Sequence, residues 1–414
     1  AIKLLKKKQK LQHLQLLHFH IGSQITDIQR VKSALREASN LFAEISKLGA
    51  PIQFVDVGGG MAVDYDGSHT NFASSANYTP IEYAADVIDI FKSCCNEAGV
   101  PHPHIVTEAG RALVAHHAVL VVEALAADDV HHNAEMPPIP AKSPEIVKRM
   151  VEILDGFVGK NFQEVYHDAI EARREALTMF DLRHLSLQDR ALAEDVFWVI
   201  CRRILDYVRQ LDYFPDELEG LEKLLSATYF CNFSLFQSVP DHWAIKQLFP
   251  VVPLHRLNEK PSRNAILADI TCDSDGVMDR FIDLRDVKDT LPLHPLKKDE
   301  PYYLGIFLVG AYQEILGDLH NLFGDTHIIH VSSGSMGYTI DKTVEGERIE
   351  DVMEYVQFTR DDLLARIRER IEESIKRKQL RLEDAAPLLR RFAMGLDTYT
   401  YLSSERKTGI NADS

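Results

Sequence analysis

The chain has 414 residues, of which 45% are hydrophobic and 26% are charged, a balance typical of a globular protein with two or three domains. Its net charge of -16 argues against nucleic acid and anionic membranes as partners, since both are negatively charged. No run of about 18 uncharged apolar residues occurs, so we predict no transmembrane helix. The five cysteines show no zinc-binding spacing, and we expect reduced thiols in a cytoplasmic protein.

The first part of the chain alternates between strand and helix patterns. Apolar runs predict strands at 14–22, 52–60 and 104–110, and helical periodicity predicts helices at 27–48 and 79–99 between them. This order implies parallel strands with right-handed crossovers. Polar residues gather where each strand ends, as they do in a β/α barrel. A closed barrel needs eight such units, so the other units lie upstream or the fold is not a barrel.

The rest of the chain divides by composition into a bundle, a β domain and further helices. Residues 124–142 are predicted to form a loop, and three amphipathic helices then predict an inserted bundle. Later segments rich in β-branched and aromatic residues predict a mainly antiparallel β domain. We therefore divide the chain into a barrel part (1–142), a helical bundle (143–225), a β domain (226–357) and carboxy-terminal helices with a tail (358–414).

Two strand-end motifs each allow two interpretations. Gly58, Gly59 and Gly60 either form a plain tight turn or let backbone N–H groups approach a phosphate. Glu108 and Arg111 form either a surface ion pair or a functional pair. In the functional reading the carboxylate faces a cationic ring nitrogen and the guanidinium faces a phosphate.

Four further residues are ambiguous when each is considered alone. His20 is either a core histidine or a site residue, and Ser23 is either a helix cap or a ligand contact. Cys272 is either an inert thiol or a reactive one, within an Asp-Ser-Asp-Gly run that usually forms a turn. Tyr312 is either a core aromatic or a site residue. Their joint occurrence decides between these interpretations.

Five motifs together resemble one enzyme family. In order, the chain reads HFHIGSQ, DVGGG, EAGR, TCDSDG and GAYQE. This set resembles the alanine-racemase-fold decarboxylases, the group of ornithine, diaminopimelate and arginine decarboxylases. Over about residues 14 to 400 it looks most like the biosynthetic arginine decarboxylases, with GAYQEILGDLHNLFGDTH as the most specific stretch. The resemblance implies a pyridoxal 5'-phosphate enzyme that converts L-arginine to agmatine and carbon dioxide in polyamine biosynthesis.

The resemblance also gives each motif a role. His20 would stack on the pyridine ring, and Glu108 would pair with the ring nitrogen and keep it protonated, which preserves the ring as an electron sink. Cys272 would protonate the carbanion left by carbon dioxide, and Asp273 would bind the distal cation of the substrate, both in a dimer partner's site. The predicted cofactor contacts, mainly to the phosphate, are Ser23, Gly58, Gly59, Gly60, Gly110, Arg111 and Tyr312.

The chain departs from the family pattern at the lysine that binds the cofactor covalently. That Schiff-base lysine lies in an earlier strand, in a motif like A-x-K-x-N, and we find no such motif here. We therefore expect the later half of a β/α barrel with its following domains. This would be either a fragment or the carboxy-terminal chain of a cleaved enzyme, inactive without the amino-terminal half.

Further expectations follow from the same resemblance. Asp64 and Tyr65 are predicted substrate contacts, Mg2+ is a second expected cofactor without a visible site, and shared active sites imply a homodimer or higher homo-oligomer. One alternative is a diaminopimelate- or ornithine-type decarboxylase; CDSDG argues against the diaminopimelate enzyme, where a Cys-Glu pair is usual. The other is a non-catalytic regulatory homologue, against which the intact Cys272 and Glu108 argue.

Overall fold

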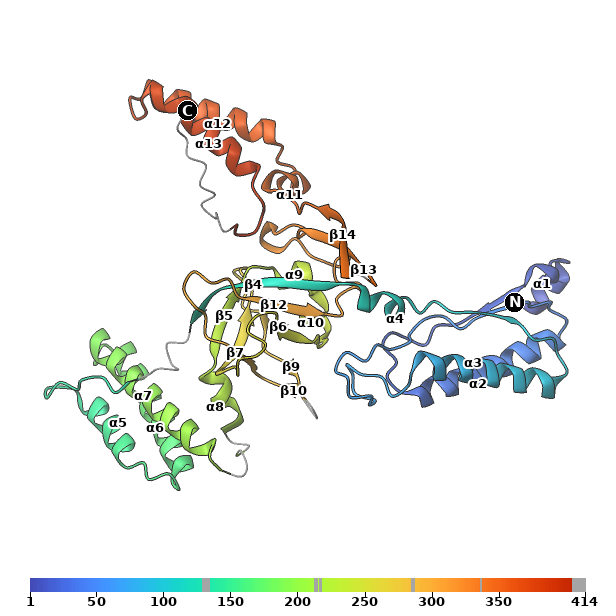
Figure 1. Cartoon of the computed structure of the whole chain (residues 1–414), viewed down its shortest axis with the longest axis horizontal. Helices are drawn as coiled ribbons and strands as arrows, with labels where there is room; N and C mark the ends of the chain where they lie inside the picture. The colour runs from blue at the N-terminus through green and yellow to red at the C-terminus, as the bar shows by residue number, and fades with distance from the viewer. Residues whose placement is uncertain (129–134, 212–214, 216–217, 284–286, 336, 404–414) are drawn as a thin grey trace.

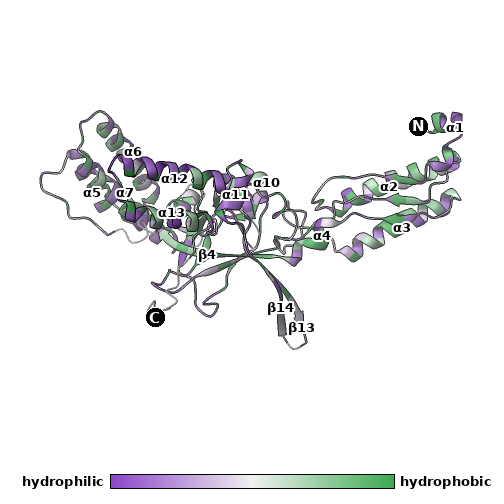
Figure 2. Cartoon of the chain, turned by 90° about the horizontal axis from the view of Figure 1, so that it is seen from above, coloured by the Kyte–Doolittle hydropathy of each residue, from purple (hydrophilic) through white to green (hydrophobic). Residues whose placement is uncertain are grey.

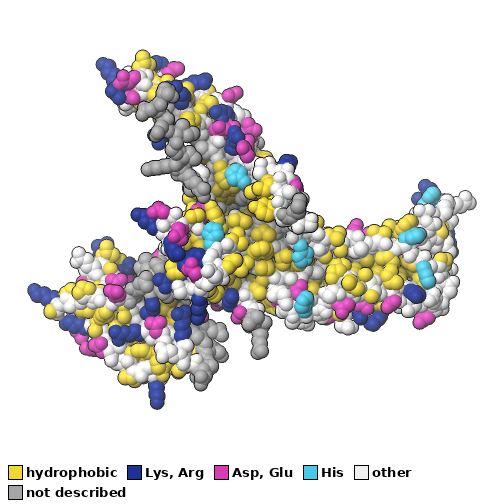
Figure 3. Space-filling model, in the orientation of Figure 1, with side chains coloured by type: hydrophobic (Ala, Val, Ile, Leu, Met, Phe, Trp, Pro, Cys, Tyr) yellow, Lys and Arg dark blue, Asp and Glu magenta, His cyan; other side chains and the backbone are white. Residues whose placement is uncertain are grey.

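The chain forms three lobes around a central β sheet (Figure 1). The computed structural model describes residues 1–128, 135–211, 215, 218–283, 287–335 and 337–403. One lobe contains the amino-terminal strands and helices, the second is a helical bundle, and the third contains the carboxy-terminal helices. Hydrophobic side chains gather over the central sheet and along the amino-terminal lobe (Figure 3).

The amino-terminal lobe is a parallel sheet with a helix after each of its first two strands. Its strands are β1 (Leu16–His18), β2 (Phe54–Asp56) and β3 (His104–Val106), in that order, and its main helices are α2 (Ile28–Lys47) and α3 (Pro80–Ala98). Asp27 caps α2, and Thr79 with Glu82 forms a capping box at the start of α3. Shorter helices at the two ends of the lobe are α1 (Ile2–Lys7), η1 (Leu11–His13), α4 (Gly110–Val114) and η2 (Ala115–His117).

Only one face of this parallel sheet is covered by its helices. Leu17, Val55 and Ile105 form the middle row of the register and pack with the apolar faces of α2 and α3. Leu16 and Phe54 point to the other face and are exposed. The three parallel strands confirm the predicted strand order, while closure into a barrel is not visible in three strands.

The bundle contains the three long helices that the sequence predicts. They are α5 (Glu145–Asp155), α6 (Phe162–Asp181) and α7 (Leu187–Val208), followed by the short α8 (Glu219–Leu224). Their apolar faces form a separate core that includes Met150, Ala169 and Ile200. Ser186 caps α7 by accepting the N–H of Asp189, whereas the Ser143 hydroxyl makes no capping bond to α5.

The central sheet has seven strands in the order β11-β7-β5-β4-β12-β6, with β8 paired to β7. All its pairs are antiparallel except β5 with β7, so the expected mainly antiparallel domain is confirmed. The strands are β4 (Val119–Asp128), β5 (Ala227–Cys231), β6 (Val251–Pro253), β7 (Arg263–Ala268), β8 (Val277–Met278), β11 (Leu291–Leu293) and β12 (Tyr303–Phe307). The pair β9 (Phe281–Ile282) and β10 (Val287–Lys288) lies apart, and α9 (Leu235–Ser238) and α10 (Pro240–Ile245) follow β5.

One sequence expectation is wrong in this region. We expected a loop from residue 124, but β4 continues to Asp128: residues 119–123 pair with β12, and residues 124–128 pair with β5. The strand therefore belongs to the central sheet and not to the parallel one, although it lies within the 1–142 part of our division. The numerical four-part division stays a prediction. Residues 129–134, in the rest of that expected loop, lie outside the described residues.

The last part of the chain is a hairpin followed by helices. The hairpin strands β13 (Ile328–Gly334) and β14 (Gly337–Val344) project from the body (Figure 2). The one-turn η4 (His320–Leu322) precedes them, and α11 (Ile349–Tyr355), α12 (Arg360–Lys376) and α13 (Leu382–Leu396) follow. The tail from residue 404 lies outside the described residues. Within the described parts, no helix combines the length and apolarity that a membrane crossing requires.

Candidate active site

The loops after β1, β2 and β3 meet at the carboxyl ends of the parallel strands. A Cβ atom on Gly58 would lie 2.3 Å from the Phe19 carbonyl oxygen, and one on Gly60 would lie 2.4 Å from that of Gly22. Both glycines have positive φ values of 68° and 98°. Any side chain here would collide with the β1 loop, so the glycines allow the two loops to touch.

His20 and Glu108 approach this glycine loop from the two neighbouring strands. The Gly59 N–H donates to Nδ1 of His20 at 3.1 Å, and the Glu108 N–H donates to the Gly58 carbonyl at 2.8 Å. Both side chains are exposed. Three sequence-predicted motifs that are far apart in the chain therefore come together at one edge of the sheet.

Arg111 lies buried beside these loops, 8% exposed. Its Nη1 donates to the Tyr65 hydroxyl at 2.9 Å, and its Nη2 lies 3.5 Å from the Ser23 hydroxyl. Its guanidinium carbon lies 4.8 Å from the centre of the Tyr312 ring, and Nη2 lies 4.0 Å from an Asp241 oxygen. Nε is buried without a hydrogen-bond partner, so the guanidinium keeps one unused donor.

Tyr312 is held in a strained backbone conformation by its neighbours. Its φ of 70° lies in the left-handed region, which non-glycine residues rarely adopt. The Gln313 side chain spans this residue, because its amide donates to the Ala311 carbonyl at 2.9 Å and to Asp241 at 2.8 Å. The Asp241 N–H donates back to Gln313 at 3.1 Å. This buried pair therefore fixes the residue that lies against Arg111.

Sequence reasoning missed both Asp241 and Gln313. A buried arginine needs a nearby negative charge, and Asp241 supplies it from α10, 130 residues along the chain. Gln313 stands beside Tyr312 within the GAYQE motif, and that motif was the signal that could have identified it.

Tyr65 and Asp64 are adjacent in sequence but lie in different surroundings. Burial raises the pKa of Tyr65, and Arg111 partly opposes this shift, so the hydroxyl stays protonated and retains a hydrogen to donate. Asp64 instead accepts the Ser75 hydroxyl at 2.7 Å and the Gly67 N–H at 3.1 Å within its own loop. Tyr65 therefore joins the Arg111 group, and Asp64 does not. The substrate role of both residues stays a prediction.

Cys272 and Asp273 lie on the turn between β7 and β8. The Cys272 N–H donates to Asn321 at 2.9 Å, and the cysteine is exposed. Asp273 accepts the Asp275 N–H at 3.0 Å, and its other oxygen lies 3.7 Å from the His320 ring. Among the described residues, no hydrogen bond or ion pair joins this turn to the Arg111 group.

Three potential metal ligands converge at the same edge of the sheet. One ligand atom each from His18, Asp56 and Glu108 lies within 4.8 Å of the other two, and no other such group occurs among the described residues. His18 Nδ1 is already 2.8 Å from Asp56. Neither His18 nor Asp56 was singled out from the sequence, although they open the HFHIGSQ and DVGGG motifs.

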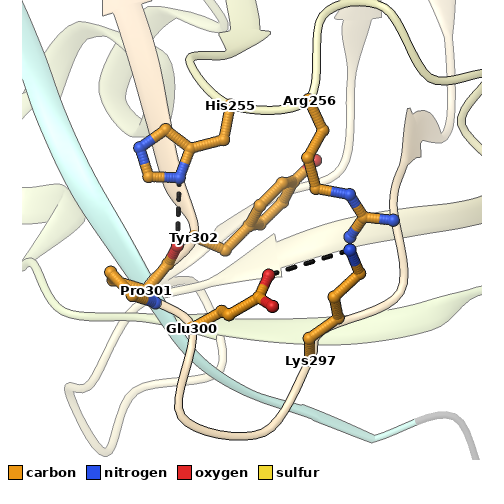
Figure 4. A pocket seen from close by; sticks show the side chains of 6 residues that line it. All are labelled: His255, Arg256, Lys297, Glu300, Pro301 and Tyr302. Atoms are coloured by element: carbon orange, nitrogen blue, oxygen red, sulfur yellow. Dashed lines mark hydrogen bonds and ion pairs between the residues drawn. The ribbon is translucent and has the colours of Figure 1, made fainter.

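A separate hollow lies on the β domain and carries paired charges (Figure 4). His255 binds the Pro301 carbonyl at 3.0 Å, Lys297 lies 3.7 Å from Glu300, and Arg256 lies 2.7 Å from Glu259. Because these cations already face carboxylates or carbonyls, the hollow offers no free cationic site for an anion.

Comparison with known proteins connects this geometry to a family. Residues 1–115 match the family model described as the pyridoxal binding domain of pyridoxal-dependent decarboxylases. Residues 140–222 match the arginine decarboxylase helical bundle domain, and residues 349–402 match the arginine decarboxylase C-terminal helical extension. The chain is also 47% identical to a biosynthetic arginine decarboxylase of Nostoc and 48% identical to one of Thermosynechococcus vestitus, and each match covers 98% of this chain.

The chain belongs to the biosynthetic arginine decarboxylase family. The family resemblance found in the sequence is thereby confirmed. A crystal structure of the biosynthetic arginine decarboxylase SpeA from Campylobacter jejuni superimposes with a TM-score of 0.84 at 34% identity, covering 97% of this chain and 65% of that one. The chain spans about three fifths of the curated relatives, 59% of the Nostoc protein and 63% of the Thermosynechococcus protein. The solved structure that it matches is a decarboxylase of the alanine-racemase fold, the fold that the motifs predicted.

Proposed function

We propose that this chain is part of an enzyme that decarboxylates L-arginine to agmatine and carbon dioxide, a step of polyamine synthesis. The observation that carries the proposal is the match of its bundle and its carboxy-terminal helices to two domains described as parts of arginine decarboxylases. These matches favour arginine over the diaminopimelate and ornithine alternatives. The intact group around Arg111 argues against a regulatory homologue without catalysis.

Pyridoxal 5'-phosphate fits the residues at the carboxyl ends of β1–β3. The buried Arg111 has an unused Nε donor, the protonated Tyr65 has a hydrogen to donate, and a Cβ on Gly110 would meet open space. We therefore assign the phosphate to Arg111 and its neighbours. The proposed cofactor contacts are Ser23, Gly58, Gly59, Gly60, Gly110, Arg111 and Tyr312.

The remaining roles follow from the placement of His20 and Glu108. When bound, the cofactor supplies an electron sink for the electron pair that is left on the substrate carbon when carbon dioxide departs. Glu108 is proposed to accept a hydrogen bond from the protonated ring nitrogen, and His20 to lie against the ring face. Both side chains are exposed at the strand ends, where a flat ring could reach them.

Cys272 and Asp273 are proposed to complete a site in a partner subunit. Their turn has no polar contact to the Arg111 group among the described residues, whereas both side chains are accessible. Cys272 would deliver a proton to the substrate carbon, and Asp273 would accept hydrogen bonds from the guanidinium. A homodimer or larger homo-oligomer is part of the proposal, as are the cytoplasmic location and the use of Mg2+.

The covalent lysine is proposed to come from the part of the relatives that this chain does not cover. The exposed face of β1–β3 supports this view, because parallel sheets are normally covered on both faces.

The experiment that tests this assignment mixes this chain with cofactor and then adds borohydride, which makes any covalent bond between the cofactor and a lysine permanent. We expect no stoichiometric lysine adduct on this chain, while the complete enzyme gives one and releases agmatine from arginine. A stoichiometric adduct on this chain would contradict the assignment, and a complete enzyme without arginine decarboxylation would contradict the function.

A further inference from the structure

The short helix η4 lies in the most family-specific stretch of the sequence, and the proposed function gives it no role. Asn321 stands in the middle of this turn with φ 57° and ψ 21°, and Leu322 beside it has φ 60°. Asparagine tolerates this left-handed conformation, whereas leucine rarely adopts it. A conformation of this kind persists only where the surrounding structure imposes it. The contacts of η4 therefore indicate what the turn is for.

The Asn321 side chain joins η4 to the turn that carries Cys272. The Cys272 N–H donates to the Asn321 side-chain oxygen at 2.9 Å, across 49 positions of the sequence. The bond is made to the backbone of the cysteine itself, so it holds the atom next to the Cα from which the thiol projects.

Both partners of this hydrogen bond are also anchored to the short helix α9. On one side, the buried Asp269 accepts the Leu235 N–H of α9 at 2.8 Å with one oxygen and the Thr271 N–H at 2.9 Å with the other. On the other side, the Asp318 N–H donates to the Phe236 carbonyl of α9 at 3.0 Å. The Cys272 turn and the approach to η4 are thus fixed on one support, and the asparagine bond connects them directly.

The asparagine bond is the contact that acts at the cysteine itself. The next N–H along the turn, that of Asp273, lies 3.4 Å from the Thr271 hydroxyl, which is a long hydrogen bond. Without the Asn321 oxygen, the backbone between Thr271 and Asp273 would keep only this weak contact. The direction of the Cys272 side chain therefore depends on Asn321.

We propose that Asn321 is a positioning residue that holds the Cys272 backbone so that the thiol points at the substrate carbon in the partner subunit's site. The inference rests on the proposed role of Cys272 as the proton donor. Asn321 acts through Cys272 and touches neither substrate nor cofactor. If the thiol is displaced, carbon dioxide still departs, but the proton is delivered to the cofactor instead of the substrate carbon. Hydrolysis by water then releases an aldehyde and leaves the amino group on the cofactor.

The first test measures the hydrogen bond in this chain by hydrogen exchange of amides labelled with 15N at cysteine. The five cysteines give five signals, and Cys272→Ala identifies one of them by its loss. Asn321→Gly removes the acceptor and adopts the left-handed conformation without strain. It should speed exchange at Cys272 roughly fivefold, as expected for the loss of one hydrogen bond. Asn321→Asp keeps an acceptor oxygen and should keep the slow exchange.

The matched control is Asn77→Gly, the same substitution in the amino-terminal lobe. The Asn77 side-chain oxygen accepts the Ile28 N–H at 2.9 Å, so this variant also removes a bond from an asparagine to a backbone amide. It should leave the exchange rate of Cys272 unchanged. Faster exchange at all five cysteines in Asn321→Gly would mean that Asn321 stabilises the whole fold, and the specific positioning role would be wrong.

The second test measures the ratio of aldehyde to agmatine formed from arginine by the complete enzyme. Asn321→Gly should slow agmatine formation roughly tenfold, because a proton donor that is slightly misplaced loses much of its effect. Its aldehyde fraction should lie between those of the wild type and Cys272→Ala. Asn321→Asp and Asn77→Gly should give the wild-type ratio, which a loss of stability alone would not change.

The possible failures can be told apart. Aldehyde from Cys272→Ala but not from Asn321→Gly overturns the positioning role and leaves Cys272 as the proton donor. Unchanged hydrogen exchange at Cys272 in Asn321→Gly overturns it as well. Agmatine as the sole product of Cys272→Ala at the wild-type rate overturns the proposed role of Cys272, and the inference falls with it.

Discussion

The two larger β sheets of this chain differ in how completely the chain covers them. In the central sheet, Leu267 and Leu304 are 0% exposed within a core shared by several strands. In the parallel sheet, Leu16 is 47% exposed and Phe54 lies beside it on the same uncovered face. The central sheet has its own buried core, whereas the described residues leave one face of the sheet that carries the glycine loop, His20 and Glu108 uncovered.

The largest expected difference between the two sheets is in stability. Leu304→Ala should lower the free energy of unfolding of this chain by about 2–5 kcal/mol, because it removes a fully buried side chain and leaves a cavity. Leu16→Ala should change it by less than about 0.5 kcal/mol, since the side chain is already exposed. Denaturant unfolding of the two variants measures both values. Equal losses would show that the open face is covered within the chain itself, contrary to the comparison.

The second prediction concerns the turn that projects from the central sheet. Asp273→Ala in the complete enzyme should raise the KM for arginine roughly 30-fold to several thousand-fold, because a desolvated guanidinium loses its carboxylate partner. Cofactor binding should be kept. Asp275→Ala is the matched control, a carboxylate of the same turn that lies 3.4 Å from the Trp243 ring nitrogen. Steady-state kinetics and cofactor titration on one preparation measure both quantities.

The opposite result has a definite structural meaning. Asp273 accepts the Asp275 N–H and its own carbonyl accepts the Gly276 N–H, so it also stabilises the turn. If that were its only role, Asp273→Ala would lower the melting temperature and leave the KM for arginine unchanged.

The sequence predicted local structure in this chain better than long-range contacts. The helix starts at Asp27 and Thr79, which both have side-chain caps, were placed correctly, because these signals lie within a few residues of each helix. The end of β4 was missed, because residues 124–128 pair with residues 228–231 of β5, about 100 residues further along the chain. The composition of residues 124–128 does not indicate which residues they pair with.

The candidate site shows the same limit. The motifs around Arg111 and Tyr312 came from family resemblance, since nothing in the spacing of two residues 201 positions apart predicts that they stack. Asp241 and the His18–Asp56 pair were missed for the same reason: their chemistry depends on a buried cation and on strand register. These features become visible only after folding.

The third prediction separates proton delivery from packing at Cys272. Cys272→Ala in the complete enzyme should slow agmatine formation roughly tenfold or more and divert part of the product to an aldehyde, with the amino group left on the cofactor, because the proton donor proposed for the substrate carbon is lost. Product analysis by mass spectrometry measures the ratio. Since Cys272 is exposed in this chain, the variant should keep the wild-type melting temperature. Agmatine as the sole product at the wild-type rate would leave Cys272 without a catalytic role.

The fourth prediction has the smallest expected effect and compares the reactivity of two buried thiols with that of the exposed Cys272. Burial raises the pKa of Cys201 in the bundle and of Cys231 in the central sheet to about 12, whereas Cys272 is exposed. At pH 7.5 a maleimide should therefore label Cys272 much faster than the two buried thiols, because thiolate is the reactive form.

Mass spectrometry of labelled peptides over time gives each rate, and Cys272→Ala should remove the fast phase and leave the slow ones. Raising the pH should eventually expose the buried thiols through unfolding. The pKa of each buried thiol is near 9 in the unfolded chain and near 12 in the folded chain. The folded state therefore loses stability as the pH rises from about 9 to about 12, because only the unfolded chain then releases the thiol proton. Fast labelling of Cys231 at pH 7.5 would mean that the central sheet opens readily, and the contrast between a closed scaffold and an open site sheet would then be wrong.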